Sequence, residues 1–369
     1  MKKKLLGALL SLALVATLFA GCGNNGGGST GSTGGDAKTE TAAGTGKVGV
    51  SMPTKDLQRW NQDGANMEEQ LKAAGYEVDL QYAANDVQQQ LSQVENMISG
   101  GCDVLVIAAI EGSSLGEALD MAKEAGIPVI AYDRLLMDSD AVSYYATFDN
   151  YKVGQVQAQY VIDTLDLDNA DGPFNIEFTA GDPGDNNAGF FYNGAMDLLK
   201  PYIEEGKLNV VSGQTEFEDV ATPTWGTDVA QKRAENILST NYADGTELDV
   251  WLCSNDSTAL GVENALAANY KGNYPIITGQ DCDIENTKNM IAGKQSMSVF
   301  KDTRTLAAQV VKMVGQILNG ETVDVNDTST YNNNKITVPS FLCEPVFADA
   351  NNYKEILIDS GYYTEDQLQ

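Results

Sequence analysis

An acidic and a basic side chain follow directly on a short apolar run, and this pair is the first candidate for a binding site. The run Ile127-Pro128-Val129-Ile130-Ala131-Tyr132 leads into Asp133-Arg134 with no turn residue between them. A run of this length and composition is typical of a buried parallel strand. A fixed carboxylate beside a guanidinium with five donors suits a neutral ligand that bears several hydroxyl groups. A structural ion pair or a solvated loop explains the same two residues equally well.

Similar polar and aromatic residues follow other apolar runs of the chain. They are Arg59, Trp60, Asp185, Asn187, Trp225, Asn255, Asp281 and Lys301. Ligands of open α/β sheets bind beyond the carboxyl ends of the strands, so these residues would meet if two sheets faced one cleft. Sugars suit such a cleft, because their apolar ring faces lie on indole rings while adjacent hydroxyls engage Asp, Asn and Arg.

Each of these candidates also has a structural explanation. A tryptophan is more often a packing residue than a platform for a ligand. Asp185 could serve a turn, while Asn187 and Asn255 could cap the helices that follow them. Lys301 could be a solvated charge. Asp281 is the hardest to explain structurally, because it directly follows an apolar run that predicts a buried strand.

The composition argues against an enzyme. The 369 residues include no histidine, so the commonest general base and zinc ligand is missing. Asp133, Asp185 and Asp281 could supply the carboxylate pair of a glycosidase. The basic residues beside them should keep these acids ionised, whereas a general acid must stay protonated near neutral pH. The chain contains no nucleotide-binding glycine motif, serine-hydrolase motif or metal-binding spacing of Cys and His.

The net charge is strongly negative. The chain has 52 acidic and 23 basic residues, which gives −29 at pH 7. Such a surface repels nucleic acid and anionic lipid headgroups, so a DNA-binding role is excluded. Four cysteines lie beyond the first 22 residues, and their spacing favours none of the three possible disulfide pairings; they are Cys102, Cys253, Cys282 and Cys343.

The N-terminus has the features of an exported lipoprotein. Three lysines precede an apolar run over residues 5–20, which is too short to span a membrane comfortably. Phe19-Ala20-Gly21-Cys22 is similar to a lipoprotein cleavage site, although leucine is commoner where Phe19 stands. We therefore predict a signal peptide over residues 1–21 and a lipid on Cys22. Residues 22–46 are rich in Gly, Ser and Thr and should form a flexible tether.

Strand-like and helix-like patterns alternate through the rest of the chain, and the alternation restarts near residue 174. This predicts an α/β protein with two doubly wound parallel-sheet lobes. We assign 47–149 and about 283–322 to the N-terminal lobe, and 150–282 and about 323–369 to the C-terminal lobe. The tail, with predicted strands at 335–338 and 341–346, should return across the junction, so that several crossings form a hinge.

A family resemblance is carried by a set of motifs between about Lys47 and Gln369. They are Met52-Pro53-Thr54-Lys55 with Arg59-Trp60, Val129 to Arg134, Tyr144 to Asn150, Gly184 to Ala188, Ser254-Asn255-Asp256, Gly279-Gln280-Asp281 and Val299 to Arg304. In these residues the chain resembles the periplasmic-binding-protein type 1 sugar receptors of ABC transporters. The resemblance is to the xylose-binding and multiple-monosaccharide-binding proteins in particular, which recognise xylose or glucose, galactose and arabinose.

The resemblance implies a monomeric receptor whose lobes close on a monosaccharide and then dock on an ABC permease. It implies no catalysis, cofactor, metal or nucleic acid. The polar residues named above would bind the sugar hydroxyls and ring oxygen, and Trp60 and Trp225 would pack on the ring faces. Lys55 is a weaker candidate, because the xylose receptors differ there.

The sequence predicts where the protein is located and leaves its partner and its exact ligand undecided. The lipid anchor departs from a freely soluble periplasmic form and favours the extracytoplasmic membrane face of a Gram-positive cell. A sensor that presents its sugar to a membrane kinase or chemoreceptor is the alternative function, and a furanosyl signalling molecule is an alternative ligand. Xylose, glucose and galactose all remain candidates, because cavity shape decides whether one hydroxymethyl group fits.

Overall fold

The computed structural model describes residues 45–369. The predicted signal peptide, Cys22 and the tether up to residue 44 lie outside the described residues. Within 45–369, none of the helices is long and apolar enough to cross a membrane.

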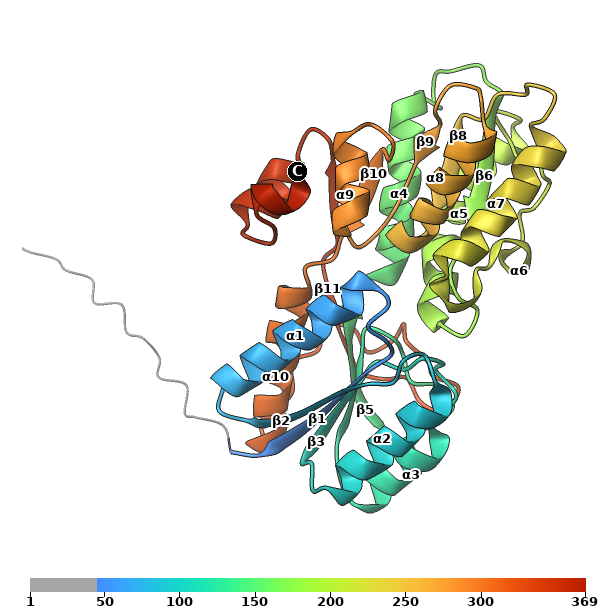
Figure 1. The fold of residues 1–369 in the computed structure, drawn as a ribbon. Coiled ribbons are helices and arrows are strands. Elements are labelled where there is room, and N and C mark those ends of the chain that lie inside the picture. The colour runs from blue at the N-terminus through green and yellow to red at the C-terminus, as the bar shows by residue number, and fades with distance from the viewer. Residues whose placement is uncertain (1–44) are drawn as a thin grey trace, which may run out of the picture. The chain divides into compact units, whose positions relative to one another are not determined.

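The first lobe is built on a six-stranded parallel sheet with the order β11-β5-β4-β3-β1-β2 (Figure 1). Its strands are β1 (Lys47–Met52), β2 (Glu77–Tyr82), β3 (Val104–Ile107), β4 (Val129–Tyr132), β5 (Val142–Phe148) and β11 (Ser340–Cys343). Its helices are α1 (Gln58–Ala73), α2 (Val87–Ser99), α3 (Gly116–Glu124) and α10 (Thr303–Leu318).

Both faces of this sheet are buried, which explains its continuous apolar runs. Val104 and Val106 pack in one core with α1 and α10, while Leu105 and Ile107 pack in another with α2 and α3. Successive side chains of a strand point to opposite faces, so one short run fills two cores.

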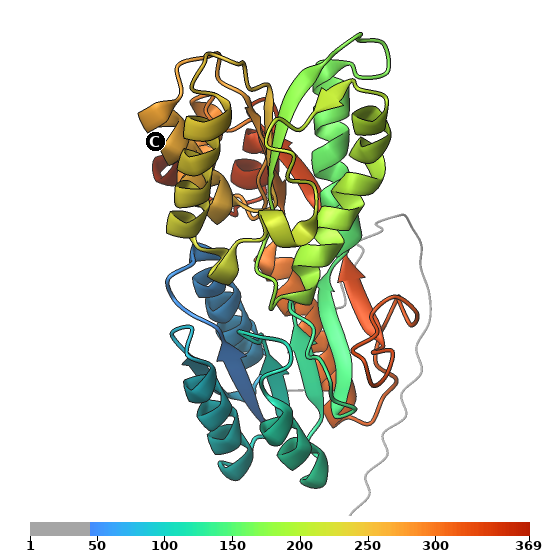
Figure 2. The same ribbon diagram turned by 90° about the vertical axis from the view of Figure 1, so that its right-hand side faces the viewer.

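The second lobe contains a four-stranded parallel sheet with the order β7-β6-β8-β9, seen from the side in Figure 2. Its strands are β6 (Phe174–Thr179), β7 (Leu208–Asn209), β8 (Val250–Cys253) and β9 (Ile276–Ile277). The antiparallel pair of β10 (Met297–Phe300) and β12 (Val346–Asp349) lies beside it through a parallel bridge between Gln280 and Val299. The helices of this lobe are α4 (Asn150–Leu165), α5 (Asn186–Glu204), α6 (Phe217–Val220), α7 (Thr227–Asn241), α8 (Asp256–Asn269) and α9 (Ile284–Ile291). The prediction of an α/β protein with two parallel sheets is confirmed.

The chain passes between the lobes three times, as expected for a multi-crossing hinge. The crossings follow β5, β10 and β11. The predicted division of the chain into two lobes differs from the observed division at two segments. Residues 284–300 pack with the second lobe, because β10 extends that sheet, and only α10 returns to the first lobe. Residues 323–343 join the first lobe, because Val323, Tyr331 and Val338 pack in its two cores and β11 pairs with β5.

The predicted tail strands also need correction. The run 341–346 is divided, since β11 ends at Cys343 and β12 begins at Val346 in the other lobe. Pro345 lies in the gap, where its missing N–H and fixed φ prevent a continuous ladder. The predicted strand at 335–338 is reduced to one isolated bridge between Asn332 and Thr337.

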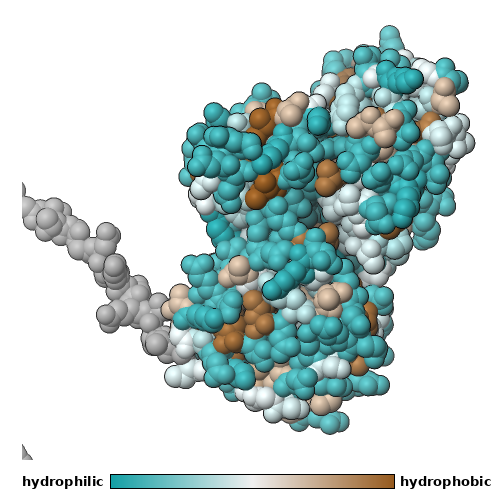
Figure 3. Space-filling model, viewed as in Figure 1, coloured by the Kyte–Doolittle hydropathy of each residue, from teal (hydrophilic) through white to brown (hydrophobic). Residues whose placement is uncertain are grey.

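The surface agrees with the charged composition. The face shown in Figure 3 is largely hydrophilic, with only small and separate apolar patches. A hydrophilic and strongly acidic surface favours solubility and says little about the fold.

Candidate ligand-binding site

One cavity lies between the two lobes. It encloses about 450 Å³ of space not filled by protein atoms, including the part open to solvent. All ten binding residues predicted from the sequence line it: Arg59, Trp60, Asp133, Arg134, Asp185, Asn187, Trp225, Asn255, Asp281 and Lys301. The strand ends of both sheets therefore converge as the sequence predicted.

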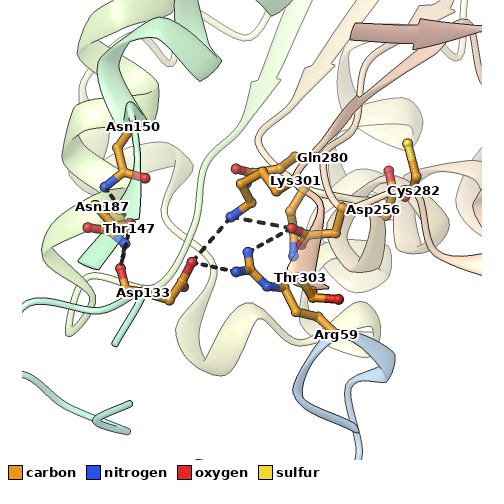
Figure 4. Close-up of polar contacts among 12 residues, drawn as sticks. Arg59, Asp133, Thr147, Asn150, Asn187, Asp256, Gln280, Cys282, Lys301 and Thr303 are labelled. Carbon is orange, nitrogen blue, oxygen red and sulfur yellow. Dashed lines mark hydrogen bonds and ion pairs between the residues drawn. The ribbon is translucent and has the colours of Figure 1, made fainter. Parts of the chain in front are cut away.

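Four charged side chains connect the lobes across this cavity (Figure 4). Arg59 of α1 donates to Asp133 at 2.6 Å and to Asp281 at 3.0 Å. Lys301 lies 3.3 Å from Asp281 and 3.7 Å from Asp133. Arg59 and Asp133 belong to the first lobe, whereas Asp281 and Lys301 belong to the second. The lobes are thus closed on the cavity and held together by ion pairs.

The pKa shifts keep the central pair charged. Burial by itself would lower the pKa of Arg59, but Asp133, Asp63 and Asp281 raise it above its ordinary value. Burial would likewise raise the pKa of Asp133, but Arg59 and Lys301 hold it below its ordinary value. The expectation that basic neighbours keep the acids ionised is met at Asp133.

A second charged group lies on the other side of the cavity. Arg134 donates to the carbonyl oxygens of Ala109 and Ile110 at 3.0 Å, and its Nε lies 3.1 Å from Asp185. The indole N–H of Trp225 also donates to Asp185, at 3.2 Å. Here burial outweighs the ion pair with Arg134, and the pKa of Asp185 is raised. The predicted effect of basic neighbours therefore differs between Asp133 and Asp185.

Two buried indole rings contribute apolar surface to the cavity. The guanidinium of Arg134 lies 5.0 Å from the ring centroid of Trp60. Trp225 meets Phe191 edge to face, with centroids 6.2 Å apart. Its ring also lies against Gly181, where a Cβ atom would come within 1.9 Å of the indole. The position of Trp225 thus depends on a residue without a side chain.

Three cavity residues have an uncommon backbone conformation. Asp133, Trp225 and Asp281 have φ values of 57°, 54° and 98°. Positive φ is uncommon outside glycine and clusters at functional sites, where the surroundings must enforce it. At Asp133 the carbonyl oxygen accepts hydrogen bonds from Tyr145 at 2.6 Å, Thr147 at 3.0 Å and Asn187 at 2.6 Å, as Figure 4 shows in part.

Some of the polar residues that line the cavity also cap helices. Asp185 caps α5 by accepting from the backbone N–H of Asn187 at 3.0 Å. Asn255 caps α8 by accepting from the backbone N–H of Thr258 at 3.0 Å. Asn187 does not cap a helix, and its side chain bonds to Asp133 and Tyr145. Capping and cavity lining coexist here, because each helix begins at the cavity wall.

Five further residues line the cavity: Leu57, Phe191, Ser257, Gln280 and Asp283. Gln280 precedes the predicted Asp281, and the other four were missed by sequence reasoning. Phe191 follows Asn187 by four residues on the same helix, so helical spacing could have revealed it. Lys55 does not line this cavity, and its ammonium lies over the ring of Tyr82.

The site shows no sign of a metal centre. In the part of the chain that the structure describes, no group of three or more Cys, Asp or Glu side chains is arranged to hold a metal ion.

Comparison with known proteins identifies the family. A family model described as a periplasmic binding protein domain matches residues 48–322, and the chain belongs to this family. The chain is 50% identical over 332 residues to the multiple sugar-binding periplasmic receptor ChvE of Rhizobium radiobacter, covering 89% of this chain and 94% of that protein. It is 35% identical to the D-xylose-binding periplasmic protein of Escherichia coli, covering 87% and 92%.

A solved structure agrees with this assignment. The chain is 69% identical to an ABC transporter solute binding protein from Clostridium phytofermentans, solved with bound β-D-glucose. The two structures superpose with a TM-score of 0.86, covering 88% of this chain and 100% of the other.

Proposed function

We propose that this protein is an extracytoplasmic receptor that captures an aldose of the xylose, glucose or galactose class by closure of its lobes. The observation that carries the proposal is the single cavity between the lobes, with ion pairs and indole rings contributed from both sides. The proposal is supported by relatives whose names state sugar binding and by a similar protein that was solved with glucose.

The charges of the cavity favour a neutral ligand. Six of the lining residues form ion pairs, three cations and three carboxylates, and their charges cancel. Burial and the neighbouring Asp256 raise the pKa of the fourth lining acid, Asp283, well above its ordinary value. The ion pairs of Asp133 and Asp281 use one oxygen of each carboxylate, Oδ1. The second oxygen of each can accept a sugar hydroxyl, and the indoles can cover the apolar ring faces.

The carboxyl groups of the cavity differ in their electrostatics. A glycosidase needs a protonated carboxylic acid at neutral pH. Arg59 and Lys301 lower the pKa of Asp133 against the effect of burial, whereas burial raises the pKa of Asp185. We propose binding without catalysis on the family assignment rather than on these shifts. Incubation with chromogenic glycosides tests this point, and sustained turnover would contradict a pure receptor.

The partner and the anchor extend the proposal. We infer delivery of the sugar to an ABC permease and attachment to the outer face of the membrane through a lipid on Cys22. In this proposal the protein acts as a monomer in a Gram-positive cell. Replacing Cys22 with alanine should release the protein from the membrane fraction, and unchanged membrane association would refute the anchor.

A thermal-shift screen tests the ligand class. We expect D-glucose, D-xylose, D-galactose or L-arabinose to raise the unfolding temperature by several degrees, because a ligand at 100 times its Kd stabilises the fold by about 2.7 kcal/mol. L-Leucine and L-phenylalanine serve as controls of similar size and different chemistry. A larger shift with either control, or no shift with any sugar, would overturn the proposal.

A further inference from the structure

The C-terminal tail of the chain is part of the second lobe. It contains a helical turn of π type (Lys354–Asp359) and a final 3₁₀ turn (Glu365–Leu368). Leu357, Tyr363 and Leu368 pack with Met290 of α9 and Phe300 of β10 in one hydrophobic core. Because this core lies entirely within the second lobe, the tail should move with that lobe.

Two consecutive tyrosines of the tail nevertheless bond to α1 in the first lobe. The hydroxyl of Tyr363 accepts from the side-chain amides of Gln58 at 2.8 Å and Gln62 at 3.0 Å, and it donates to the carbonyl oxygen of Cys282 at 2.9 Å. A hydroxyl has one donor and two acceptor positions, so all three hydrogen-bonding positions of Tyr363 are occupied. Tyr362 donates to the side-chain oxygen of Gln62 at 3.1 Å.

The same helix face makes one further bond to the second lobe. The side-chain oxygen of Gln58 accepts from the backbone N–H of Ile284, where α9 begins, at 3.1 Å. Gln58 and Gln62 are one helical turn apart, so both face the tail. Arg59 lies between them in sequence and points into the cavity instead.

These contacts do not involve the ligand cavity. Gln58, Gln62, Tyr362 and Tyr363 are absent from its lining. Burial raises the pKa of both phenols, so both hydroxyls are neutral and can donate at physiological pH. The four side chains therefore join the lobes through hydrogen bonds that include no residue of the cavity lining.

We propose that Gln58, Gln62, Tyr362 and Tyr363 form a latch between the lobes that strengthens sugar affinity by stabilising their closed arrangement. This inference rests on the proposed function. The apparent Kd of a receptor that binds in its closed state equals the intrinsic Kd divided by the closed fraction. A latch that raises the closed fraction therefore tightens the binding of every accepted sugar by one common factor.

The test is calorimetric titration of a Tyr362→Phe/Tyr363→Phe double variant. Both substitutions keep the rings and remove only the hydroxyls. We expect Kd to rise by about 10-fold or more, because the two hydroxyls form three hydrogen bonds to α1, each with a small net contribution. D-Glucose and a second sugar that stabilises the wild-type protein should weaken by the same factor.

Two further variants control this experiment. Tyr353→Phe alters a tyrosine that packs on the same core and whose hydroxyl forms no hydrogen bond to α1 within residues 45–369, so Kd should not change. Gln62→Met removes both bonds of Gln62 to the tail from the side of the first lobe, and it leaves the bonds of Tyr363 to Gln58 and Cys282 in place. This variant should also raise the Kd of both sugars by one common factor. If the double variant does not fold, Gln62→Met alone tests the latch.

The possible outcomes separate the latch from the proposed function. Wild-type affinity in both latch variants, or factors that differ between the two sugars, would overturn the latch. A wild-type protein that binds no monosaccharide would instead overturn the proposed function.

Discussion

Arg59 is positioned by contacts outside the ligand cavity as well as inside it. Its Nε donates to Asp63 at 2.8 Å, and Asp63 also accepts from the hydroxyl of Tyr132. The two remaining guanidinium nitrogens are directed at Asp133 and Asp281. Because Asp63 is fully buried, it holds the Nε edge of the guanidinium in place and leaves the other two nitrogens for the cavity carboxylates.

Asp281 is the residue whose removal should affect binding most clearly. We expect Asp281→Ala to weaken sugar binding by about 2–4 kcal/mol, or roughly 30- to 1,000-fold in Kd. The physical reason is that Arg59 and Lys301 would keep their charges in a buried site with one partner fewer. Calorimetric titration with the preferred sugar measures the change.

Asp228→Ala is the matched control for this prediction. Asp228 lies on α7 with a side chain that is 74% exposed, and it pairs only with Lys232. Surface pairs of this kind contribute little, so Kd should stay at the wild-type value. Equal affinities for Asp281→Ala and the wild type would refute the role assigned to Asp281.

The binding residues were predictable to the extent that they follow strands. Asp133 and Lys301 directly follow apolar runs, and three residues separate Asp281 from the run that ends at Ile277. Parallel strands bring their carboxyl ends to one edge. Ser257 and Asp283 carry no such signal, because they belong to a helix and a loop that reach the cavity only through tertiary packing. The positive φ of Asp281 was also invisible, since no glycine or turn motif marks it.

At the scale of elements, the loop after β6 and the 3₁₀ turn Pro223–Trp225 depend on each other. Gly181 has no side chain, and the ring of Trp225 occupies the space where a Cβ atom would lie. Aromatic packing this close leaves no room for even a methyl group, so the two segments fix the orientation of the indole together.

Gly181→Ala should therefore weaken sugar binding although Gly181 does not line the cavity. The new methyl group would lie within 2.4 Å of three indole atoms, so the ring must shift. We expect a Kd increase of about 10-fold or more, in line with the cost of about 1–3 kcal/mol for overpacking. Calorimetric titration checks this result.

Gly189→Ala is the control for that substitution. Gly189 lies inside α5, and an added Cβ atom would meet nothing within 4 Å. Alanine in a helix interior is favourable by up to about 1 kcal/mol, so this variant should be as stable as the wild type or more stable. Sugar binding that is equally strong in Gly181→Ala and Gly189→Ala would contradict the role of Gly181.

Helix α8 introduces a pH dependence of stability. Glu263 of α8 is 4% exposed, and burial raises its pKa to about 7. Between about pH 4.5 and 7 the folded chain keeps a proton on Glu263 that the unfolded chain has lost. The free energy of unfolding contributed by this group is therefore highest below pH 4.5 and falls as the pH rises to about 7.

The measurement is denaturant unfolding of the ligand-free protein at pH 5 and pH 8. We expect Glu263→Gln to reduce the loss of stability between these values by about 1–3 kcal/mol, because glutamine stays neutral throughout. Glu204→Gln, at a side chain of α5 that is 67% exposed, should leave the loss unchanged. A Glu263→Gln variant with the same pH dependence as the wild type would refute the burial of a protonated carboxyl.

The elements themselves were predictable where periodicity was strong. The alternation of strand-like and helix-like patterns predicted two parallel sheets, and both are present. The tail was harder, because the apolar run around Pro345 contains two strands that belong to different sheets. The hydrophobic pattern alone does not determine which sheet edge a strand joins, so the predicted lobe boundaries differ from the observed ones.

At the scale of the whole molecule, the binding site depends on the return of the chain to each lobe. Lys301 stands at the crossing between β10 and α10, and Asp149 and Asn150 stand at the crossing between β5 and α4. Rotation about these crossings would separate Arg59 from Asp281 and Lys301 from Asp133. Opening thus breaks the same ion pairs that surround the cavity, which couples ligand capture to lobe closure.

The central claim is that a monosaccharide binds in the cavity between the lobes. The most direct measurement is a crystal structure of the protein with the sugar that stabilises it most in the thermal-shift screen. We expect one sugar ring between Trp60 and Trp225, with its hydroxyls within hydrogen-bond distance of Asp133 and Asp281. A sugar bound elsewhere on the molecule, with this cavity occupied only by water, would contradict it.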